Sequence, residues 1–169
     1  ALNSALVEER FAPALTAALK NMVSLTQDLA EGQGILVRRL HYPGIRQDIY
    51  VISTPQTFLP ENWSNVFAQG LKKYQEGHKH SKHAVVELGS GTGAVSMAMA
   101  LMNMAPKIIG LDYNPAAVEV AKLNARLNGL EDSISFYTSD LTAALKPMLQ
   151  ADPKLIIDLF AGCLPQIPS

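Results

Sequence analysis

The sequence predicts an α/β fold, a parallel sheet covered by helices, preceded by a smaller cap of helices and a β-hairpin. Two observations lead to this prediction. From residue 84 onward, short apolar runs alternate with amphipathic helical segments, and such runs are typical of parallel strands buried on both faces. The earlier residues lack this alternation and contain helical stretches and a strand pair around a Pro-Gly turn. We therefore place the cap at residues 1–76 and the sheet domain at residues 77–169.

The cap is predicted to begin with a helix and to continue as a hairpin. In residues 5–30, leucines recur at helical spacing, with Pro13 expected to interrupt or restart the helix. After a glycine break, ILVRRLHY and DIYVIS flank the turn PGIRQ, which predicts a β-hairpin. A second helix is expected along TFLPENWSNVFAQGLKKY, with Pro60 in its first turn.

The sheet domain follows the polar stretch GHKHSKH. Its predicted strands are AVVELG, KIIGLD, ISFYTS and KLIIDLF. The helices between them run through AVSMAMALMNM, PAAVEVAKLNARLN and LTAALKPML. The methionines that crowd the first of these helices are interpreted as adaptable core packing. His78, His80 and His83 lie among lysines without nearby cysteine or acidic ligands, which predicts a solvated linker and no metal site.

Composition places the chain among soluble globular proteins. It has 169 residues, of which 48% are hydrophobic, and a formal net charge of −1. A nearly neutral chain offers no electrostatic footprint for nucleic acid or an anionic membrane. No run approaches the roughly 18 apolar residues of a membrane span, no export leader is visible, and the single cysteine is compatible with a reducing cytosol. We expect a cytoplasmic protein whose partner is a small molecule or a protein.

The stretch VVELGSGTGAVS follows the first strand of the sheet domain and opens a helix, the context in which a glycine-rich loop binds a ligand. Gly89, Gly91 and Gly93 let the chain turn sharply and let a ligand lie against peptide groups without meeting a Cβ atom. The G-x-G-x-G spacing differs from the G-x-G-x-x-G of dinucleotide-binding proteins, and Glu87 stands just before it. We therefore do not expect a diphosphate ligand.

Two more acidic residues close the next two strands. Asp112 lies about 20 residues beyond the loop, where an acidic side chain reaches a ribose diol in such folds. Asp140 ends the third strand, where an adenine amino group could be received. An adenosine group with a positively charged tail would suit these carboxylates together with Glu87. The alternative is a tight turn with acidic surface caps, but three motifs at three successive strand ends favour a ligand site.

VELGSGTG, GLDYNPAAVEVAKLNARLNG and FYTSDL resemble the cofactor motifs of class I S-adenosylmethionine-dependent methyltransferases. The resemblance implies a Rossmann-like sheet that binds S-adenosyl-L-methionine and releases S-adenosyl-L-homocysteine. It implies that Glu87 and the glycine loop hold the methionine part, that Asp112 binds the ribose and that Tyr113 packs by the adenine, whose edge Asp140 and Leu141 contact. The implied cofactor-binding residues are Glu87, Gly89, Ser90, Gly91, Gly93, Asp112, Tyr113, Asn114, Asp140 and Leu141.

The end of the fourth strand, IIDLFAGCLPQIPS, bears on the methyl acceptor. Many amine and amide methyltransferases of this superfamily carry N-P-P-Y here, whose asparagine accepts the N–H hydrogens of the substrate. This chain reads C-L-P-Q from Cys163 to Gln166, and cysteine is a weak acceptor. A nitrogen substrate is therefore disfavoured, whereas a thioether has no N–H or O–H hydrogen to receive and needs no general base.

GCLPQIPS further resembles the G-C-I-P-Q-I-L-N stretch of methionine S-methyltransferase, and STPQTFLPENWSNVFAQGL is similar to the segment before the glycine loop in that family. The likeness covers about residues 50–169. It implies methyl transfer to the sulfur of L-methionine, giving S-methylmethionine, with Phe58 and Trp63 as lid residues. The catalytic residues at the acceptor wall would be Cys163, Pro165 and Gln166. The plainer interpretations are a small buried hydrophobe for Cys163 and an anchor between cap and core for Trp63.

Three other functions stay open. The same fold could act on a protein glutamine, or the chain could be a cofactor-binding module without turnover. A nicotinamide-dependent oxidoreductase is disfavoured by the glycine spacing. The sheet of the resembled family has seven strands, and this sequence supplies four. The fourth strand would then be an uncovered apolar edge, and such an edge makes a protein prone to aggregation. We therefore expect the sheet to be truncated here, with further strands and an additional C-terminal region in the parent protein.

Overall fold

The structure is a computed structural model that describes residues 34–57, 60, 62–77 and 83–162. The helix expected within residues 5–30 lies outside the described residues. So do Phe58 and the three residues of the expected acceptor wall, Cys163, Pro165 and Gln166. Within the described part of the chain, no helix is long and apolar enough to cross a membrane.

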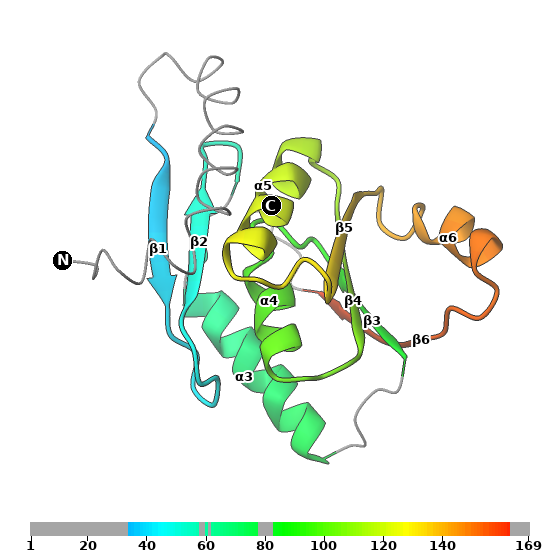
Figure 1. The fold of residues 1–169 in the computed structure, drawn as a ribbon, viewed down its shortest axis with the longest axis horizontal. Helices are drawn as coiled ribbons and strands as arrows, with labels where there is room; N and C mark the ends of the chain where they lie inside the picture. Colours follow the sequence, from blue (N-terminus) through cyan, green and yellow to red (C-terminus); the bar gives the residue numbers. More distant parts are fainter. Residues whose placement is uncertain (1–33, 58–59, 61, 78–82, 163–169) are drawn as a thin grey trace, which may run out of the picture.

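The molecule is built in layers, which Figure 1 shows from a hairpin on one side to the last helix on the other. The hairpin lies against two helices, which cover one face of a parallel sheet, and a short helix covers the opposite face. The strands are β1 (Leu36–Leu40), β2 (Ile49–Ser53), β3 (Ala84–Leu88), β4 (Lys107–Asp112), β5 (Ile134–Thr138) and β6 (Ile157–Gly162). The helices are α3 (Asn62–Gly77), α4 (Ala94–Leu101), α5 (Pro115–Leu127) and α6 (Leu145–Ala151).

The four-stranded sheet has the order β5-β4-β3-β6, and every pair in it is parallel. This confirms the prediction of a Rossmann-like parallel sheet. Strand β3 is central and its side chains alternate between two hydrophobic clusters, because successive residues of a strand point to opposite faces. Val85 joins the cluster under α4 and α5, whereas Val86 joins the cluster that includes Leu145 of α6. Both faces of β3 are therefore buried, which explains its unbroken apolar sequence.

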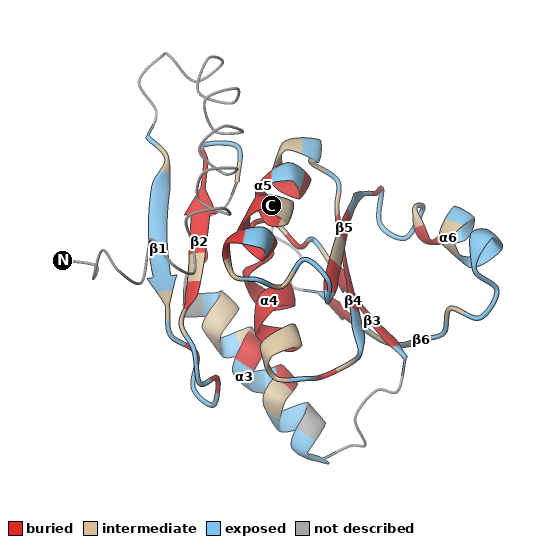
Figure 2. Ribbon diagram, in the orientation of Figure 1, coloured by how far each residue is buried: buried red, intermediate tan, exposed pale blue. Residues whose placement is uncertain are grey.

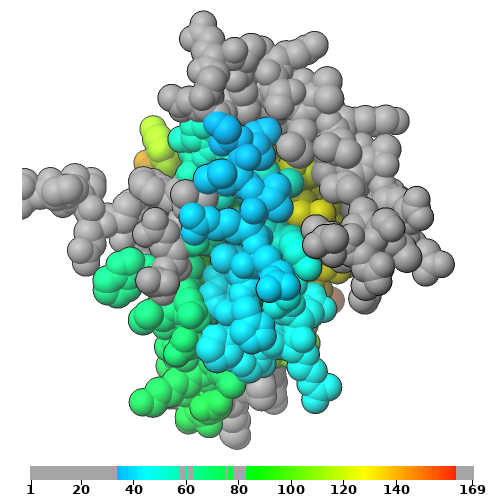
Figure 3. Space-filling model, turned by 90° about the vertical axis from the view of Figure 1, so that its left-hand side faces the viewer, coloured from blue at the N-terminus to red at the C-terminus, as the bar shows by residue number. Residues whose placement is uncertain are grey.

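The predicted hairpin is confirmed, and its two strands differ in burial. Strand β1 pairs antiparallel with β2, and the side chains of β1 are mostly exposed while those of β2 are mostly buried. Figure 3 shows the hairpin spread across one face of the molecule, with α3 (green) beside it. Ile49 and Val51 of β2 share a hydrophobic cluster with Met97 and Met99 of α4. The hairpin and the sheet thus share one core, in which the α4 methionines are packing residues as predicted.

Figure 2 shows that burial is concentrated in β2, α4 and the centre of the parallel sheet. Strand β6 forms one edge of the sheet within the described residues. Its residues alternate between exposed positions and positions that are half-buried or, at Ala161, buried. Helix α6 begins at Leu145 and so is shorter than the helix expected from residue 141. Leu141 has a φ of 47°, in the left-handed region, and the Ala144 amide donates to Ser139 Oγ at 3.0 Å, so this stretch is a turn.

The first testable prediction concerns Gly110, which lies on β4 beneath the buried ring of Phe136. A Cβ atom at Gly110 would fall inside the van der Waals envelope of that ring, which cannot retreat because its far end already touches Gly93. Overpacking of this kind costs about 1–3 kcal/mol. We expect Gly110→Ala to lower the free energy of unfolding by about that amount in urea titrations.

The control is Gly70→Ala on α3, where nothing lies within 4 Å of the added Cβ atom. This substitution is expected to leave stability unchanged or to raise it by about 0.5–1 kcal/mol. A Gly110→Ala variant as stable as the wild type would contradict the packing described here.

Candidate active site

The loop between β3 and α4 is held tightly against the end of β4. The amides of Gly89 and Ser90 both donate to the carbonyl oxygen of Leu111, at 2.8 and 3.0 Å. The amide of Gly93 donates to the Ser90 carbonyl at 2.7 Å, and α4 begins immediately afterwards. These hydrogen bonds fix the shape of the loop.

All three glycines of this loop have positive φ angles, but two of them need glycine for different reasons. Gly93 has a φ of 78°, and a Cβ atom there would lie 2.7 Å from the Phe136 ring and 3.2 Å from the Ala121 Cβ. Gly93 therefore lacks a side chain because the hydrophobic core leaves no room for one. Gly91, at 52°, has nothing within 4 Å of the position that its Cβ atom would take. A side chain at Gly91 is thus disfavoured by backbone conformation alone, and the space around the missing Cβ position is open.

Asp112 joins the glycine loop to the end of β4. Its Oδ2 accepts the Gly91 amide hydrogen at 2.7 Å, and its Oδ1 accepts the Asn114 amide hydrogen at 2.9 Å. Asn114 in turn caps α5, since its Oδ1 accepts from the Ala116 amide at 3.0 Å, and its Nδ2 donates to the Gln56 carbonyl at 2.8 Å. The structure therefore brings together Gly91, Asp112 and Asn114, which the sequence predicted as parts of one site.

The other residues predicted around the adenosine lie on the surface. Tyr113 is 78% exposed and Leu141 is 60% exposed, and Asp140 is exposed as well. The turn that carries Asp140 and Leu141 is fixed by Ser139, whose hydroxyl donates to the Leu141 carbonyl at 2.8 Å and whose amide donates to the Asp112 carbonyl at 2.8 Å. These side chains surround an accessible edge of the sheet, and their contacts with adenine stay a prediction.

Glu87 is buried in the core with 3% of its surface exposed, and the hydroxyl of Ser96 in α4 donates a hydrogen bond to its Oε2. Burial raises the pKa of the Glu87 carboxyl from its ordinary 4.5 to about 8, the hydrogen bonds from Ser96 oppose that rise, and the charge of Asp112 adds to it. Burial, together with the charge of Glu87, raises the pKa of Tyr42 to about 12. Glu87 thus connects β3 with α4, and its contact with a cofactor stays a prediction.

Several buried hydroxyls near the loop have no hydrogen-bond partner within the described residues. Ser90 Oγ in the glycine loop is one, and Ser53 Oγ and Thr54 Oγ1, at the end of β2, are two more. Leaving a buried hydroxyl unpaired costs about 1–3 kcal/mol, and a polar ligand or water at this edge would remove that cost. Ser53 and Thr54 were not predicted as site residues from the sequence, although they are the first two residues of the segment STPQTFLPENWSNVFAQGL.

Two other side chains singled out from the sequence are Trp63 and His83. Trp63 on α3 is 71% exposed, which does not fit an anchor between cap and core, and its role as a lid stays a prediction. His83 pairs with Asp158 of β6, with Nδ1 and Oδ1 3.1 Å apart. Within the described residues, no group of three histidine, cysteine or acidic side chains could hold a metal ion; His78 and His80 lie outside them.

The raised pKa of Glu87 predicts how stability depends on pH. The folded chain binds the Glu87 proton more tightly than the unfolded chain between pH 4.5 and about 8. The free energy of unfolding should therefore fall as the pH rises through this window. Because Glu87→Gln removes the titration, this variant should lose less stability than the wild type between about pH 5.5 and 8.5, by about 1 kcal/mol or more.

Urea titrations at both ends of this window measure the effect. The matched control is Glu131→Gln, which changes an exposed carboxylate and should keep the pH dependence of the wild type. Parallel pH curves for Glu87→Gln and the wild type would show that burial does not perturb this carboxyl.

Comparison with known proteins agrees with this geometry. Residues 79–161 match the family described as a methyltransferase domain. A methionine S-methyltransferase of Zea mays is 34% identical over 144 residues, covering 75% of this chain and 13% of the relative. A methyltransferase of Methanocaldococcus jannaschii, whose name assigns it to the N5 of protein glutamine, is 53% identical over 57 residues, covering 34% of this chain and 27% of the relative.

The solved structures support the fold alone. A human methyltransferase 10 domain containing protein has a TM-score of 0.52 at 17% identity, covering 65% of this chain and 51% of that chain. The chain spans only a small part of the length of the curated relatives that it matches, 13% in the case of the maize enzyme. With its parallel sheet, its glycine loop and the carboxylate that closes β4, the chain belongs to the class I S-adenosylmethionine-dependent methyltransferases.

Proposed function

We propose that this protein binds S-adenosylmethionine along the glycine loop and transfers its methyl group to the sulfur of L-methionine. The observation that carries the cofactor part is the hydrogen bond between Asp112 Oδ2 and the Gly91 amide, which joins two cofactor motifs at one sheet edge. The observation that carries the acceptor part is the 34% identity with a methionine S-methyltransferase over 144 residues.

The residues at this edge fit the proposed cofactor. Each carboxylate oxygen of Asp112 accepts one backbone hydrogen bond and keeps a second lone pair, which can accept a ribose hydroxyl. Gly91 leaves room for the ligand to lie against the backbone. The Ser90 hydroxyl is buried and has no hydrogen-bond partner among the described residues, so it is a candidate to pair with the polar methionine end. When bound, the cofactor supplies a methyl group on a positively charged sulfur.

The proposed acceptor wall follows directly from β6. Gly162, the last residue of β6, pairs with Leu88, the last residue of β3, so the chain leaves β6 beside the start of the glycine loop. The residues that come next include Cys163, Pro165 and Gln166. Because the thioether of methionine attacks as a neutral nucleophile, the chain needs no general base. Its contribution would be in-line positioning, worth up to about 7–11 kcal/mol in well-oriented reactions.

A second candidate is methyl transfer to the N5 of a protein glutamine. It is favoured by the local 53% identity with the Methanocaldococcus jannaschii protein over 57 residues. The objection to it is Cys163, which stands where a nitrogen substrate would require an amide oxygen. A cofactor-binding module without turnover would show cofactor affinity and no transfer to either acceptor.

Loss of the Asp112 carboxylate tests the cofactor site. Asp112→Ala removes both acceptors for ribose hydroxyls and the hydrogen bond to Gly91, and a hydrogen bond to a charged group contributes about 1.5–3 kcal/mol. We expect the dissociation constant for S-adenosylhomocysteine, measured by calorimetry, to rise about tenfold or more. Asp132→Ala, at an exposed turn, is the control and should bind like the wild type; unchanged affinity of Asp112→Ala would remove its proposed role.

The acceptor is tested by radiolabelled methyl transfer with the complete protein. Labelled S-adenosylmethionine is incubated with free L-methionine in one reaction and with a glutamine-containing peptide in another. We expect label in S-methylmethionine and none in the peptide, because the fourth-strand motif disfavours a nitrogen acceptor. Label in the peptide alone would replace the first candidate by the second, and label in neither, with cofactor binding intact, would leave the module without turnover.

A further inference from the structure

Asn124 of α5 is fully buried and joins the cap hairpin to the glycine loop. Its Oδ1 accepts the Ile52 amide hydrogen at 2.8 Å, and its Nδ2 donates to the Ile52 carbonyl at 2.9 Å. The same Nδ2 donates to the carbonyl of Thr92 in the glycine loop, also at 2.9 Å. Both amide hydrogens of Asn124 are therefore used, one on each of two segments far apart in the sequence.

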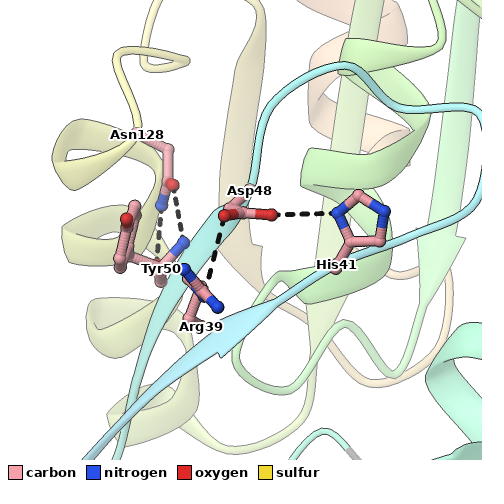
Figure 4. A network of polar contacts seen from close by, with 5 residues as sticks. All are labelled: Arg39, His41, Asp48, Tyr50 and Asn128. Carbon is pink, nitrogen blue, oxygen red and sulfur yellow. Dashed lines mark hydrogen bonds and ion pairs between the residues drawn. The ribbon is translucent and has the colours of Figure 1, made fainter.

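Asn128, which caps the C-terminus of α5 four residues after Asn124, makes a similar pair of bonds with the same strand. Its Oδ1 accepts the Tyr50 amide hydrogen at 2.8 Å and its Nδ2 donates to the Tyr50 carbonyl at 2.7 Å, as Figure 4 shows. Residues four apart on a helix are separated by about 6 Å, and residues two apart on a strand by about 6.6 Å. The spacing of the two asparagines therefore matches the spacing of Tyr50 and Ile52. Their side chains form hydrogen bonds with the backbone edge of β2, as a neighbouring strand would.

The two asparagines differ in their remaining contacts. The side-chain amide of Asn128 donates to the Asn124 carbonyl at 2.7 Å and to Met97 Sδ of α4 at 3.4 Å, whereas the side-chain amide of Asn124 donates to the Thr92 carbonyl of the glycine loop. Thr92 is 4% exposed and lies between Gly91, which Asp112 holds, and Gly93, which packs on Phe136. Asn124 thus links β2 directly to the middle of the glycine loop.

We propose that Asn124 is a positioning residue that couples docking of the cap hairpin to the conformation of the glycine loop. Cofactor binding at the loop then tightens the hairpin, and a docked hairpin strengthens cofactor binding by the same factor, because coupling between two sites is reciprocal. Ser53 and Thr54, whose buried hydroxyls have no partner among the described residues, directly follow Ile52 and move with it. The inference rests on the proposed binding of S-adenosylmethionine at this loop.

Hydrogen exchange tests this coupling, because a purely structural role of Asn124 does not predict that ligand binding slows amide exchange in the hairpin. In the wild type, saturating S-adenosylhomocysteine is expected to slow exchange of the Ile52 and Tyr50 amides. In Asn124→Ala, the ligand should no longer slow exchange at these amides. The dissociation constant measured by calorimetry should rise between about 5- and 150-fold, the usual range of such couplings.

The matched control is Asn128→Ala, which removes the equivalent bonds to β2 and leaves the link to Thr92. It should keep ligand-dependent protection at Ile52 and an affinity within about threefold of the wild type, well below the range expected for Asn124→Ala. Urea titrations ensure that both variants are compared while fully folded. Equal losses of affinity and protection in the two variants would overturn the proposal.

Failure of the coupling can be distinguished from failure of the proposed function. If Asn124→Ala does not fold, hydrogen exchange of the wild type still tests the coupling. Bound S-adenosylhomocysteine that leaves exchange of the Ile52 amide unchanged would refute it. If the wild type does not bind S-adenosylhomocysteine at all, the proposed function fails, and the inference that rests on it fails with it. Binding without a difference between the Asn124 and Asn128 variants would refute the coupling and leave the proposed function intact.

Discussion

The hydrogen bond from the Gly91 amide to Asp112 is the contact on which the site depends. It exists because β3 and β4 are parallel neighbours, so their carboxyl ends meet at one edge of the sheet. The Leu111 carbonyl, which binds the first two amides of the glycine loop, adds a second link between the same two strand ends. Sheet topology thus determines the shape of the loop, and the loop leaves Gly91 facing open space.

The fold could be predicted from the sequence because its signals are local. Continuous apolar runs indicate the strands, a Pro-Gly turn indicates the hairpin, and Asn-Pro indicates the start of α5. Each of these signals spans only a few residues. The start of α6 could not be predicted, because LTAALKPML has helical composition throughout and the turn depends on Ser139 binding the Ala144 amide. The division at residue 77 stays a prediction, since the hairpin and the sheet share one hydrophobic cluster.

The candidate site could be predicted in part. The motifs identified Gly91, Asp112 and Asn114, which the structure brings together. The sequence could not distinguish Gly93, which is bare because of Phe136, from Gly91, which is bare because of its backbone angle. Asn124 lies within the motif GLDYNPAAVEVAKLNARLNG, but its role could not be predicted. A polar residue in an amphipathic helix is expected to face solvent, and the partners of Asn124 lie on strand and loop segments distant in the sequence. Long-range contacts of this kind require coordinates.

The hydrogen bonds from Asn124 and Asn128 also bear on the exposure of a strand edge. An open strand edge can accept a strand from another molecule and so start aggregation. Asn124 and Asn128 occupy the backbone groups of Ile52 and Tyr50 that would otherwise form such an edge on β2. Within the described residues, α5 covers that side of the hairpin, with Leu123 and Leu127 packed against Ile52 and the two asparagines bonded to its backbone groups.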